Sequence, residues 1–415
     1  MRAPAAEVRG SGVSDLGHGM DRSLKRRFAS FYFFLFLPIG IHAPYLFLYF
    51  KRLGFTDSQL GTLAAVTPLL NVFAPPLWGA LADMFGDRRR MLAALLLCAA
   101  LVFPWLSQAS SFGVTLALMI VFSAFAFPPV AIADAIALEN VERRGGDYGR
   151  LRMWGSLGFA VPLIAFGLVL GKGAGQSAAS LFPIFISYTI FRLMSAAWVG
   201  VLPASHGERR GFFDLRAVKA FANWRFVALA SCAVVAMGAM SAYYLYFTIY
   251  LDEVGIADNV KGYFWAIAVA SETTMMIFVG GLVRRIGLKW TFTLGLFGCA
   301  LRLFAFSFQL GPAGIAAVQL LHALTFTTVT VSSITFVSRL IPPELRASGQ
   351  TMWMALTGGI GSAAGSKLAG VAAGAFGLMG MFRVFAGVAA VALVAAVILV
   401  KEPPEREPSR ASVEQ

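Results

Sequence analysis

Three ionisable residues lie well inside three different apolar runs of this sequence: Glu272, Arg302 and His322. An ionisable side chain at the centre of a membrane helix costs about 2.5 to 3.5 kcal/mol on insertion scales, so such residues usually face a cavity or one another. At a rise of about 1.5 Å per residue, the three residues come to comparable depths in their runs. One shared polar cluster is therefore geometrically possible.

The residue types in this set can exchange protons. A carboxylate and an imidazole both take up and release a proton, and a guanidinium that moves relative to a carboxylate changes its proton affinity. We predict that Glu272, Arg302 and His322 form a proton-coupling group, with Gln319 and Thr325 as solute-binding residues on the same helical face as His322. Two simpler interpretations stay open. Glu272 and Arg302 could form a static pair between helices, and His322 could hydrogen-bond without titrating.

The remaining polar residues in apolar runs are more dispersed. Asp134 and Arg152 lie at the neighbouring ends of two adjacent runs and could form a charge pair, or they could lie at the membrane surface as a gate or topology anchor. His42, midway along its run, could line a cavity or be a packed, hydrogen-bonded residue. Lys367 lies in a glycine-rich run without an obvious acidic partner, where it could form an ion pair with Glu272 or attract an anionic solute.

The runs that carry these residues are long enough to cross a membrane. Hydrophobic residues make up 58% of the chain and charged residues only 13%, which is too few charges for an ordinary soluble domain. A crossing needs about 20 apolar residues. We predict an all-α membrane protein with twelve transmembrane helices, at 28–50, 58–82, 91–107, 113–138, 151–171, 179–202, 224–251, 260–283, 290–308, 313–340, 350–374 and 380–400.

Basic residues are distributed unevenly between the gaps that separate these runs. Most of the 34 Lys and Arg residues fall on one side of the predicted membrane, and the other side holds Lys51, Arg52, Lys172, Lys261 and Arg383. The positive-inside rule then places both termini in the cytoplasm. The net charge of +13 follows from this topology and does not indicate a nucleic-acid partner. The expected parts are a disordered cytoplasmic tail (1–27), a six-helix bundle (28–202), a central cytoplasmic loop (203–223), a second six-helix bundle (224–400) and a second cytoplasmic tail (401–415).

The gap between the second and third runs contains a specific pattern, Gly79-Ala-Leu-Ala-Asp-Met-Phe-Gly-Asp-Arg-Arg-Arg90. We predict that Gly79, Asp83, Gly86 and Arg88 form a conformational latch, because the acid can interact with a helix terminus and the arginines with cytoplasmic surfaces. Six helices later, GGLVRRIGLK repeats the glycine and the basic turn but lacks the acid. Repetition at that distance is typical of transporters built from two related halves.

The Gly79–Arg90 pattern resembles the signature loop of the major facilitator superfamily. Four further segments resemble its branch of phenylpropionate permeases and oligosaccharide and nucleoside proton symporters: FYFFLFLPIGIHAPYLFLYFKRLGF, YGRLRMWGSLGF, QLLHALTF and IPPELRASGQ. The resemblance covers nearly the whole chain. It implies the major facilitator fold of two six-helix pseudo-repeat bundles and proton-coupled transport.

The resemblance also implies roles for individual residues. Related symporters use an acid, an arginine and a histidine on the helices that here carry Glu272, Arg302 and His322, and they place residues matching Arg152 and Trp154 near the substrate. A guanidinium could hold a carboxylate or hydroxyls, and an indole could stack on a ring. One departure matters, because the lactose permease has a carboxylate where this chain has Thr325. Proton coupling through that position is not expected.

We therefore expect a secondary transporter of the bacterial inner membrane that imports a small organic solute together with protons and works as a monomer. Excess cations in the runs favour an aromatic acid such as phenylpropionate, with a sugar, oligosaccharide or nucleoside as the alternative. Efflux by antiport and a non-transporting membrane sensor stay open as further alternatives. No enzyme, cofactor or metal site is predicted, since no run shows a nucleophile with a base, a phosphate loop or metal-ligand spacing.

Overall fold

The computed structural model of the protein describes residues 20–109, 111–170, 177–205, 223–342 and 345–403. These residues are helical almost throughout, and none of them lies in a β-strand. Inside a bilayer a helix satisfies its own backbone hydrogen bonds, which explains why so apolar a chain folds in this way. Most of the predicted central loop and of the two predicted tails lies outside the described residues. The first helix already begins at Arg22, six residues before the predicted first crossing.

The helices follow the predicted runs closely. In the first half they are α1 (Arg22–Arg52), α2 (Asp57–Phe85), α3 (Arg88–Val102), α4 (Phe112–Ala126), α5 (Pro128–Arg144), α6 (Tyr148–Ala165) and α7 (Pro183–Trp198). In the second half they are α9 (Trp224–Glu253), α10 (Asp258–Phe306), α11 (Pro312–Leu320), α12 (Thr328–Leu340), α13 (Arg346–Met354) and α14 (Ser362–Leu399). The predicted fourth crossing is divided into α4 and α5 because Pro128 and Pro129 lack the N–H groups that would continue the helix. Two widened helical turns, Ala323–Thr327 and Ala355–Gly361, interrupt the predicted tenth and eleventh crossings.

Ten helical segments of the described chain are long and apolar enough to cross a membrane. Two of them are too long for one crossing, since the 49 residues of α10 would make a straight helix of about 74 Å against a hydrocarbon layer of about 30 Å. Each contains one glycine with left-handed backbone, Gly287 in α10 (φ 84°) and Gly377 in α14 (φ 69°). With two passes in each of these, the ten segments correspond to the twelve expected crossings.

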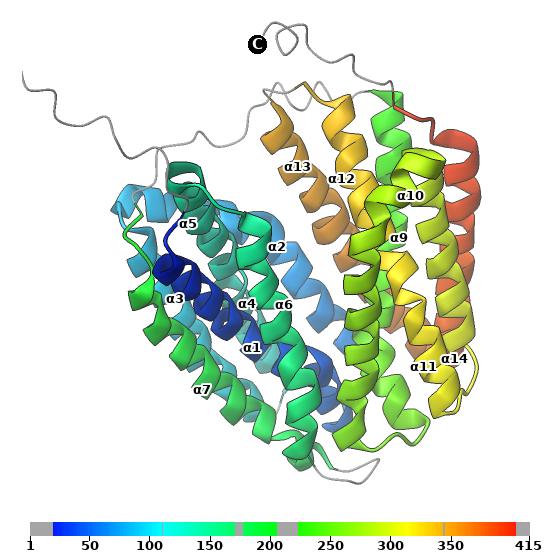
Figure 1. The fold of residues 1–415 in the computed structure, drawn as a ribbon. Coiled ribbons are helices and arrows are strands. Elements are labelled where there is room, and N and C mark those ends of the chain that lie inside the picture. The colour runs from blue at the N-terminus through cyan, green and yellow to red at the C-terminus, as the bar shows by residue number, and fades with distance from the viewer. Residues whose placement is uncertain (1–19, 110, 171–176, 206–222, 343–344, 404–415) are drawn as a thin grey trace, which may run out of the picture.

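The helices form two groups, with α1–α7 on one side and α9–α14 on the other (Figure 1). Contacts between the groups run mainly through α2 with α14, α1 with α9, and α6 with α10. Small residues make these approaches possible. A Cβ atom added to Gly61 of α2 would lie 2.9 Å from the Cα of Gly370 in α14, and one added to Gly262 of α10 would overlap the carbonyl group of Leu163 in α6.

The two turns that resemble each other in sequence share two features: each contains a glycine with positive φ, and a carboxylate caps the backbone N–H groups of the helix that follows. Gly86 ends α2 with φ 71°, and the carboxylate of Asp87 then accepts hydrogen bonds from the N–H groups of Arg89 and Arg90. The second turn has no local acid, but Glu402, after α14, takes the corresponding position. Its two carboxylate oxygens accept from the N–H groups of Leu288 (2.7 Å) and Lys289 (2.9 Å), directly after the left-handed Gly287. The capping carboxylate that Asp87 provides in the first turn is therefore provided in the second by Glu402, three residues after the last helix ends.

Candidate functional site

A cavity of about 400 Å³ lies between the two groups of helices. Residues from α1, α2, α4 and α6 line one side, and residues from α9, α10 and α14 line the other. Most of the lining is apolar or aromatic and includes Phe47, Phe122, Phe127, Phe159, Tyr244 and Trp265. No Lys, Arg, Asp or Glu is among the lining residues. Such a surface suits an uncharged solute with a flat apolar face.

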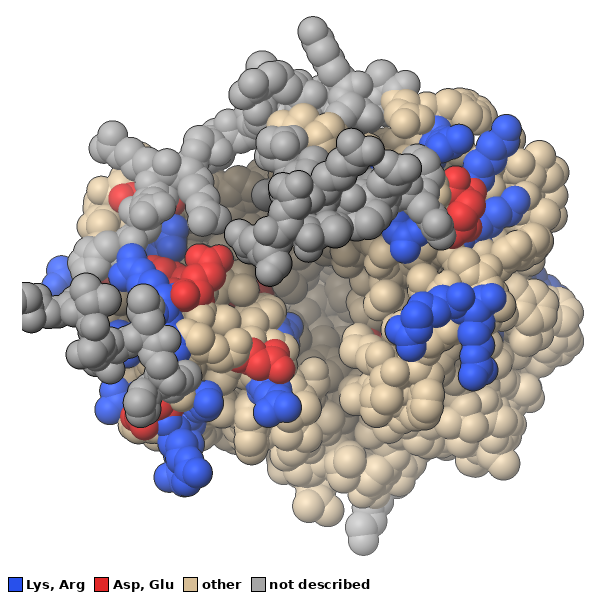
Figure 2. Space-filling view, turned by 45° about the horizontal axis from the view of Figure 1, so that its top comes forward, with Lys and Arg blue, Asp and Glu red and all other residues tan. Residues whose placement is uncertain are grey.

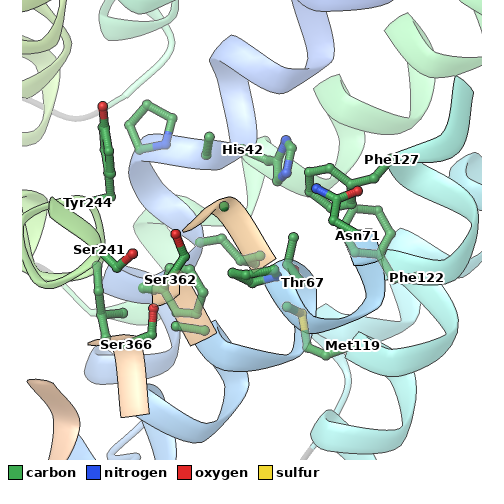
Figure 3. Close-up of a pocket in the computed structure, with 18 of the residues that line it drawn as sticks. His42, Thr67, Asn71, Met119, Phe122, Phe127, Ser241, Tyr244, Ser362 and Ser366 are labelled. Carbon is green, nitrogen blue, oxygen red and sulfur yellow. The ribbon is translucent and has the colours of Figure 1, made fainter. Parts of the chain in front are cut away.

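Polar groups enter this cavity from both sides. Figure 3 shows His42, Thr67 and Asn71 on one side and Ser241, Tyr244, Ser362 and Ser366 on the other. His42, expected from the sequence to line a cavity, does lie in its wall. Its imidazole is edge-on to the rings of Phe103, Phe122 and Tyr188, and its Nδ1 is 3.0 Å from the carbonyl oxygen of Pro38. This histidine is therefore also packed and hydrogen-bonded within its own half.

Glu272, His322 and Arg302 lie in one row. The Nε2 atom of His322 is 3.3 Å from a carboxylate oxygen of Glu272, and its Nδ1 atom is 2.6 Å from a guanidinium nitrogen of Arg302. The structure thus brings together the three residues that the sequence placed at similar depths. It also corrects the pairing considered there, because His322 lies between Glu272 and Arg302. Among the described contacts, none joins those two directly.

Gln319 and Thr325 complete this cluster. Arg302 donates to the side-chain oxygen of Gln319, and Thr325 Oγ1 lies 3.1 Å from His322 Nδ1. Both are fully buried, so neither presents a free polar group to the cavity. The widened turn Ala323–Thr327 begins directly after His322; such turns are frequent at functional sites.

Sequence reasoning missed Tyr243 of α9, which contacts both Gln319 and Arg302 of this cluster. Its hydroxyl lies 3.1 Å from the oxygen and 3.0 Å from the nitrogen of the Gln319 amide. The guanidinium carbon of Arg302 lies 3.8 Å from the centre of its ring. A cation over an aromatic face is stabilised by the ring quadrupole, so Tyr243 offsets part of the cost of burying Arg302. The only signal in the sequence was a tyrosine pair in an apolar run.

The cluster adjoins the cavity through the next residue, Tyr244. Tyr244 lines the cavity, its ring is edge-on to His322 at 6.2 Å, and it stacks on Trp265, another lining residue. The carboxylate end of the row is the more accessible one, since the Glu272 side chain is 19% exposed and Arg302 as a residue only 1%. Glu272 is therefore the exposed end of the row and Arg302 the buried end.

Asp134 and Arg152 also lie together, in the first half. Arg152 Nε is 3.8 Å from Asp134 Oδ1, and the same oxygen accepts a hydrogen bond of 2.7 Å from the hydroxyl of Tyr32. The Arg152 guanidinium lies 4.0 Å from the centre of the Phe36 ring. The geometry is that of a loose, partly exposed ion pair next to aromatic rings, outside the wall of the cavity.

Two residues that we expected near the solute lie elsewhere. Trp154 is 42% exposed and lines a separate hollow with residues such as Lys25 and Arg150. Lys367 is exposed, and its amine donates to Thr62 Oγ1 (2.7 Å) and Ser58 Oγ (3.3 Å) in α2. Neither residue belongs to the wall of the cavity, and Lys367 forms no ion pair with Glu272. The expectation for Trp154 came from the family resemblance and that for Lys367 from its place in an apolar run, but the direction of each side chain depends on the rotation of its helix.

The four residues of the expected latch gather at the end of α2. Arg88 donates to Asp83 (2.9 Å), Gly86 provides the left-handed turn, and Gly79 lines a small hollow beside Asp83 and Arg88. Arg88 also lies 3.7 Å from Glu139 in α5. All of these partners belong to the first half. Within the described residues, no ion pair or hydrogen bond joins Asp83 to the second half.

The opposite end of the molecule is joined by ion pairs that sequence reasoning did not foresee. Arg52, at the end of α1, donates to Asp252 of α9 (2.5 Å) and to both oxygens of Asp258 of α10 (2.8 Å each). Lys261 contacts the same two aspartates at 2.5 Å. The Asp258 and Lys261 side chains are completely buried. We refer to Arg52, Asp252, Asp258 and Lys261 as the end cluster.

The end cluster connects the first half to the second at the lower end in Figure 1. Figure 2, which brings the upper end toward the viewer, shows a hollow between the two groups of helices with Lys and Arg side chains on both sides of it. In this conformation the two halves are thus joined by ion pairs at one end and separated by a hollow at the other.

Comparisons with known proteins agree with this architecture. The chain is 25% identical to the maltose permease of Geobacillus stearothermophilus over 342 residues, which cover 81% of this chain and 85% of the permease. It is 24% identical to a protein of Escherichia coli named "Probable 3-phenylpropionic acid transporter", over 74% of this chain and 80% of that one. The crystal structure of the nucleoside transporter NupG superposes with a TM-score of 0.80 at 19% identity, covering 91% of this chain and 99% of that one.

These relatives are transporters and not enzymes, and their names include three different solutes. The family model described as "MFS_1 like family" matches residues 25–384, which is most of the chain. The sequence patterns, the helical fold and this match agree: the chain belongs to the MFS_1-like family and is a multi-pass membrane transporter of the major facilitator superfamily.

Proposed function

We propose that the protein is a proton-coupled symporter that imports a small organic solute by alternating access. The observation that carries this proposal is the row of Glu272, His322 and Arg302 beside a cavity between the two halves. A proton on Glu272 or His322 changes the net charge of a mostly buried group that also contains a fixed cation. Such a change can favour one arrangement of the second half over another, which couples proton binding to the transition of the loaded carrier.

The joined end and the hollowed end support an alternating mechanism. In this conformation the end cluster holds the halves together at one end, and the ion pairs of the latch in the described part of the chain, Arg88 with Asp83 and Glu139, lie within the first half. The reverse arrangement requires separation of Arg52 from its two aspartates, together with closure of the hollow next to the latch. We propose that the hollowed, Lys- and Arg-rich end faces the cytoplasm of a bacterial cell, and that the monomer is the transporting unit.

The cavity favours an uncharged solute over an aromatic acid. The sequence-based preference for an anion depended on Arg152, Arg302 and Lys367, and none of these lines the cavity. A carboxylate there would lose its hydration without gaining a cation, which costs several kcal/mol. Aromatic walls with scattered hydroxyl and amide groups instead suit a sugar or nucleoside. Relatives named for maltose and for nucleosides support this class.

The test is uptake by purified protein in proteoliposomes, across a panel of nucleosides, sugars and aromatic acids, with and without an imposed proton gradient. We expect accumulation of at least one uncharged solute that depends on the gradient. The matched variant is Glu272→Gln, which preserves shape but cannot titrate. It should lose gradient-driven accumulation and retain exchange of labelled for unlabelled solute. Accumulation of every accepted solute irrespective of the gradient would refute symport.

A further inference from the structure

Most polar groups of the cavity wall are already hydrogen-bonded within the protein. Ser241 donates to the carbonyl of Met237 (2.9 Å), and Thr67 is paired with Ser123 (2.9 Å). The imidazole of His42 bonds the carbonyl of Pro38, and the indole N–H of Trp265 donates to Thr248. A satisfied group gains little from contact with a solute, so these groups contribute mainly shape.

Asn71 differs from these groups. It lies on α2, one helical turn from Thr67 on the face that lines the cavity. Its side chain is exposed, and none of the described residues makes a hydrogen bond with its amide. Figure 3 labels Asn71 on the same side of the cavity as Phe122 and Phe127, and all three residues belong to the cavity wall. A primary amide presents a donor and an acceptor side by side, so one flat polar group of matching pattern can bind both at once.

We propose that Asn71 is a specificity-determining residue, which binds a solute ring carrying adjacent N–H and C=O groups while Phe122 and Phe127 contact the ring. The proposal rests on the transport function proposed above and narrows its solute class to cyclic amides, of which the pyrimidine bases of nucleosides are an example. The reason is the pairing of groups together with the shape of the ring: a flat ring with an N–H beside a C=O satisfies both atoms of the Asn71 amide in its own plane, which leaves its two faces for the aromatic side chains of the wall. The tyrosine hydroxyl of Tyr244 and the hydroxyl of Ser366 lie across the cavity, where they can contact the hydroxylated part of such a solute.

The experiment uses uridine and N3-methyluridine, which differ only in the ring N–H. Proton-driven uptake of labelled uridine by the full-length protein in proteoliposomes is measured with each compound as competitor. We expect uridine to compete at least about tenfold better than N3-methyluridine, since the methyl group leaves the Asn71 oxygen without its donor. Asn71→Leu, close in size but without polar atoms, should bring the ratio close to one.

Two further variants keep the test decisive. Asn71→Ser is smaller and retains a hydroxyl, but it cannot present a paired donor and acceptor; it should also lose the preference if the leucine variant does not fold. Leu69→Ala, on the same helix but outside the cavity wall, should retain the wild-type ratio. An unchanged ratio in both Asn71 variants would overturn the role of Asn71.

Failure of this inference can be told apart from failure of the proposed function. If wild-type protein accumulates sugars or aromatic acids under a proton gradient but not uridine, or accepts both uridines equally, symport stands and the cyclic-amide proposal is wrong. If no solute of the panel responds to the gradient, the proposed function itself fails.

Discussion

The end cluster allows a quantitative test of how the conformation is held. Replacing Arg52 by Met keeps a long apolar stem but removes the guanidinium that joins α1 to Asp252 and Asp258. The four charges of the cluster balance, two positive against two negative. Without Arg52, two aspartates share Lys261 alone, and Asp258 has no exposure to water. Breaking a buried ion pair in this way costs about 3 to 5 kcal/mol.

This cost falls on one conformation only. The pairs of Arg52 join the two halves, so they are present while this end is closed and absent once it opens. A loss of about 3 kcal/mol shifts the equilibrium between the two by about two powers of ten, and about 5 kcal/mol by more than three. Arg52→Met should therefore favour the conformation that is open at the lower end in Figure 1.

The measurement is the alkylation rate of a reporter cysteine in detergent-solubilised protein. Ile256, buried between α9 and α10, is replaced by Cys in a background without Cys98, Cys232 and Cys299. We expect Arg52→Met to raise the rate at least tenfold. The control is Arg383→Met, because Arg383 contacts Ser307 and Phe308 in its own half and should leave the rate unchanged. Equal rates in wild type and Arg52→Met would refute the reasoning.

Three further outcomes follow from single contacts. Glu402→Ala removes the cap of the helix after Gly287 and should lower the free energy of unfolding by about 0.5 to 2 kcal/mol. The measurement is thermal unfolding in detergent, with replacement of the exposed acid in Glu142→Ala as the control. Equal unfolding midpoints for the two variants would contradict this prediction. Gly262→Ala inserts a Cβ against the backbone of α6 and should separate α10 from α6, raising alkylation of the same reporter cysteine; a rate at the wild-type level would show that the helices adjust. Gln319→Leu removes the hydrogen-bond acceptor of one guanidinium nitrogen of Arg302 and the partner of the Tyr243 hydroxyl, and should cost about 1 to 3 kcal/mol in the same unfolding assay. The exposed Gln350→Leu should be nearly neutral.

The crossings themselves were predictable, because each depends only on a contiguous apolar run. The predicted ranges 58–82 and 224–251 agree with α2 and α9 to within a few residues at each end. The turn at Gly86 was predictable for a similar reason, since its sequence pattern is local. Depth along a run likewise brought Glu272, Arg302 and His322 to one level, where the structure has them in contact.

The order within that row was not predictable, because His322 lies between the other two only once three helices have packed at particular rotations. The same holds for Trp154 and Lys367: the family resemblance placed the first near the solute and its apolar run suggested the second, but in the structure neither side chain belongs to the cavity wall. The hydrogen bonds of Glu402 were not predictable either, because Leu288, which it caps, lies 114 residues earlier in the chain.

The membrane class, the crossings and the depth of each ionisable residue thus follow from the amino-acid sequence alone, because hydropathy and helical rise are properties of a single segment. The pairing of side chains becomes clear only in the folded molecule. Arg52 was a loop cation in the sequence and joins the two halves in the fold. Asn71 was one amide in an apolar run and is a polar group of the cavity wall that makes no side-chain hydrogen bond within the described ranges. Which side chains pair depends on how the helices of the two halves are rotated and how closely they approach one another. No single segment of the sequence contains that information.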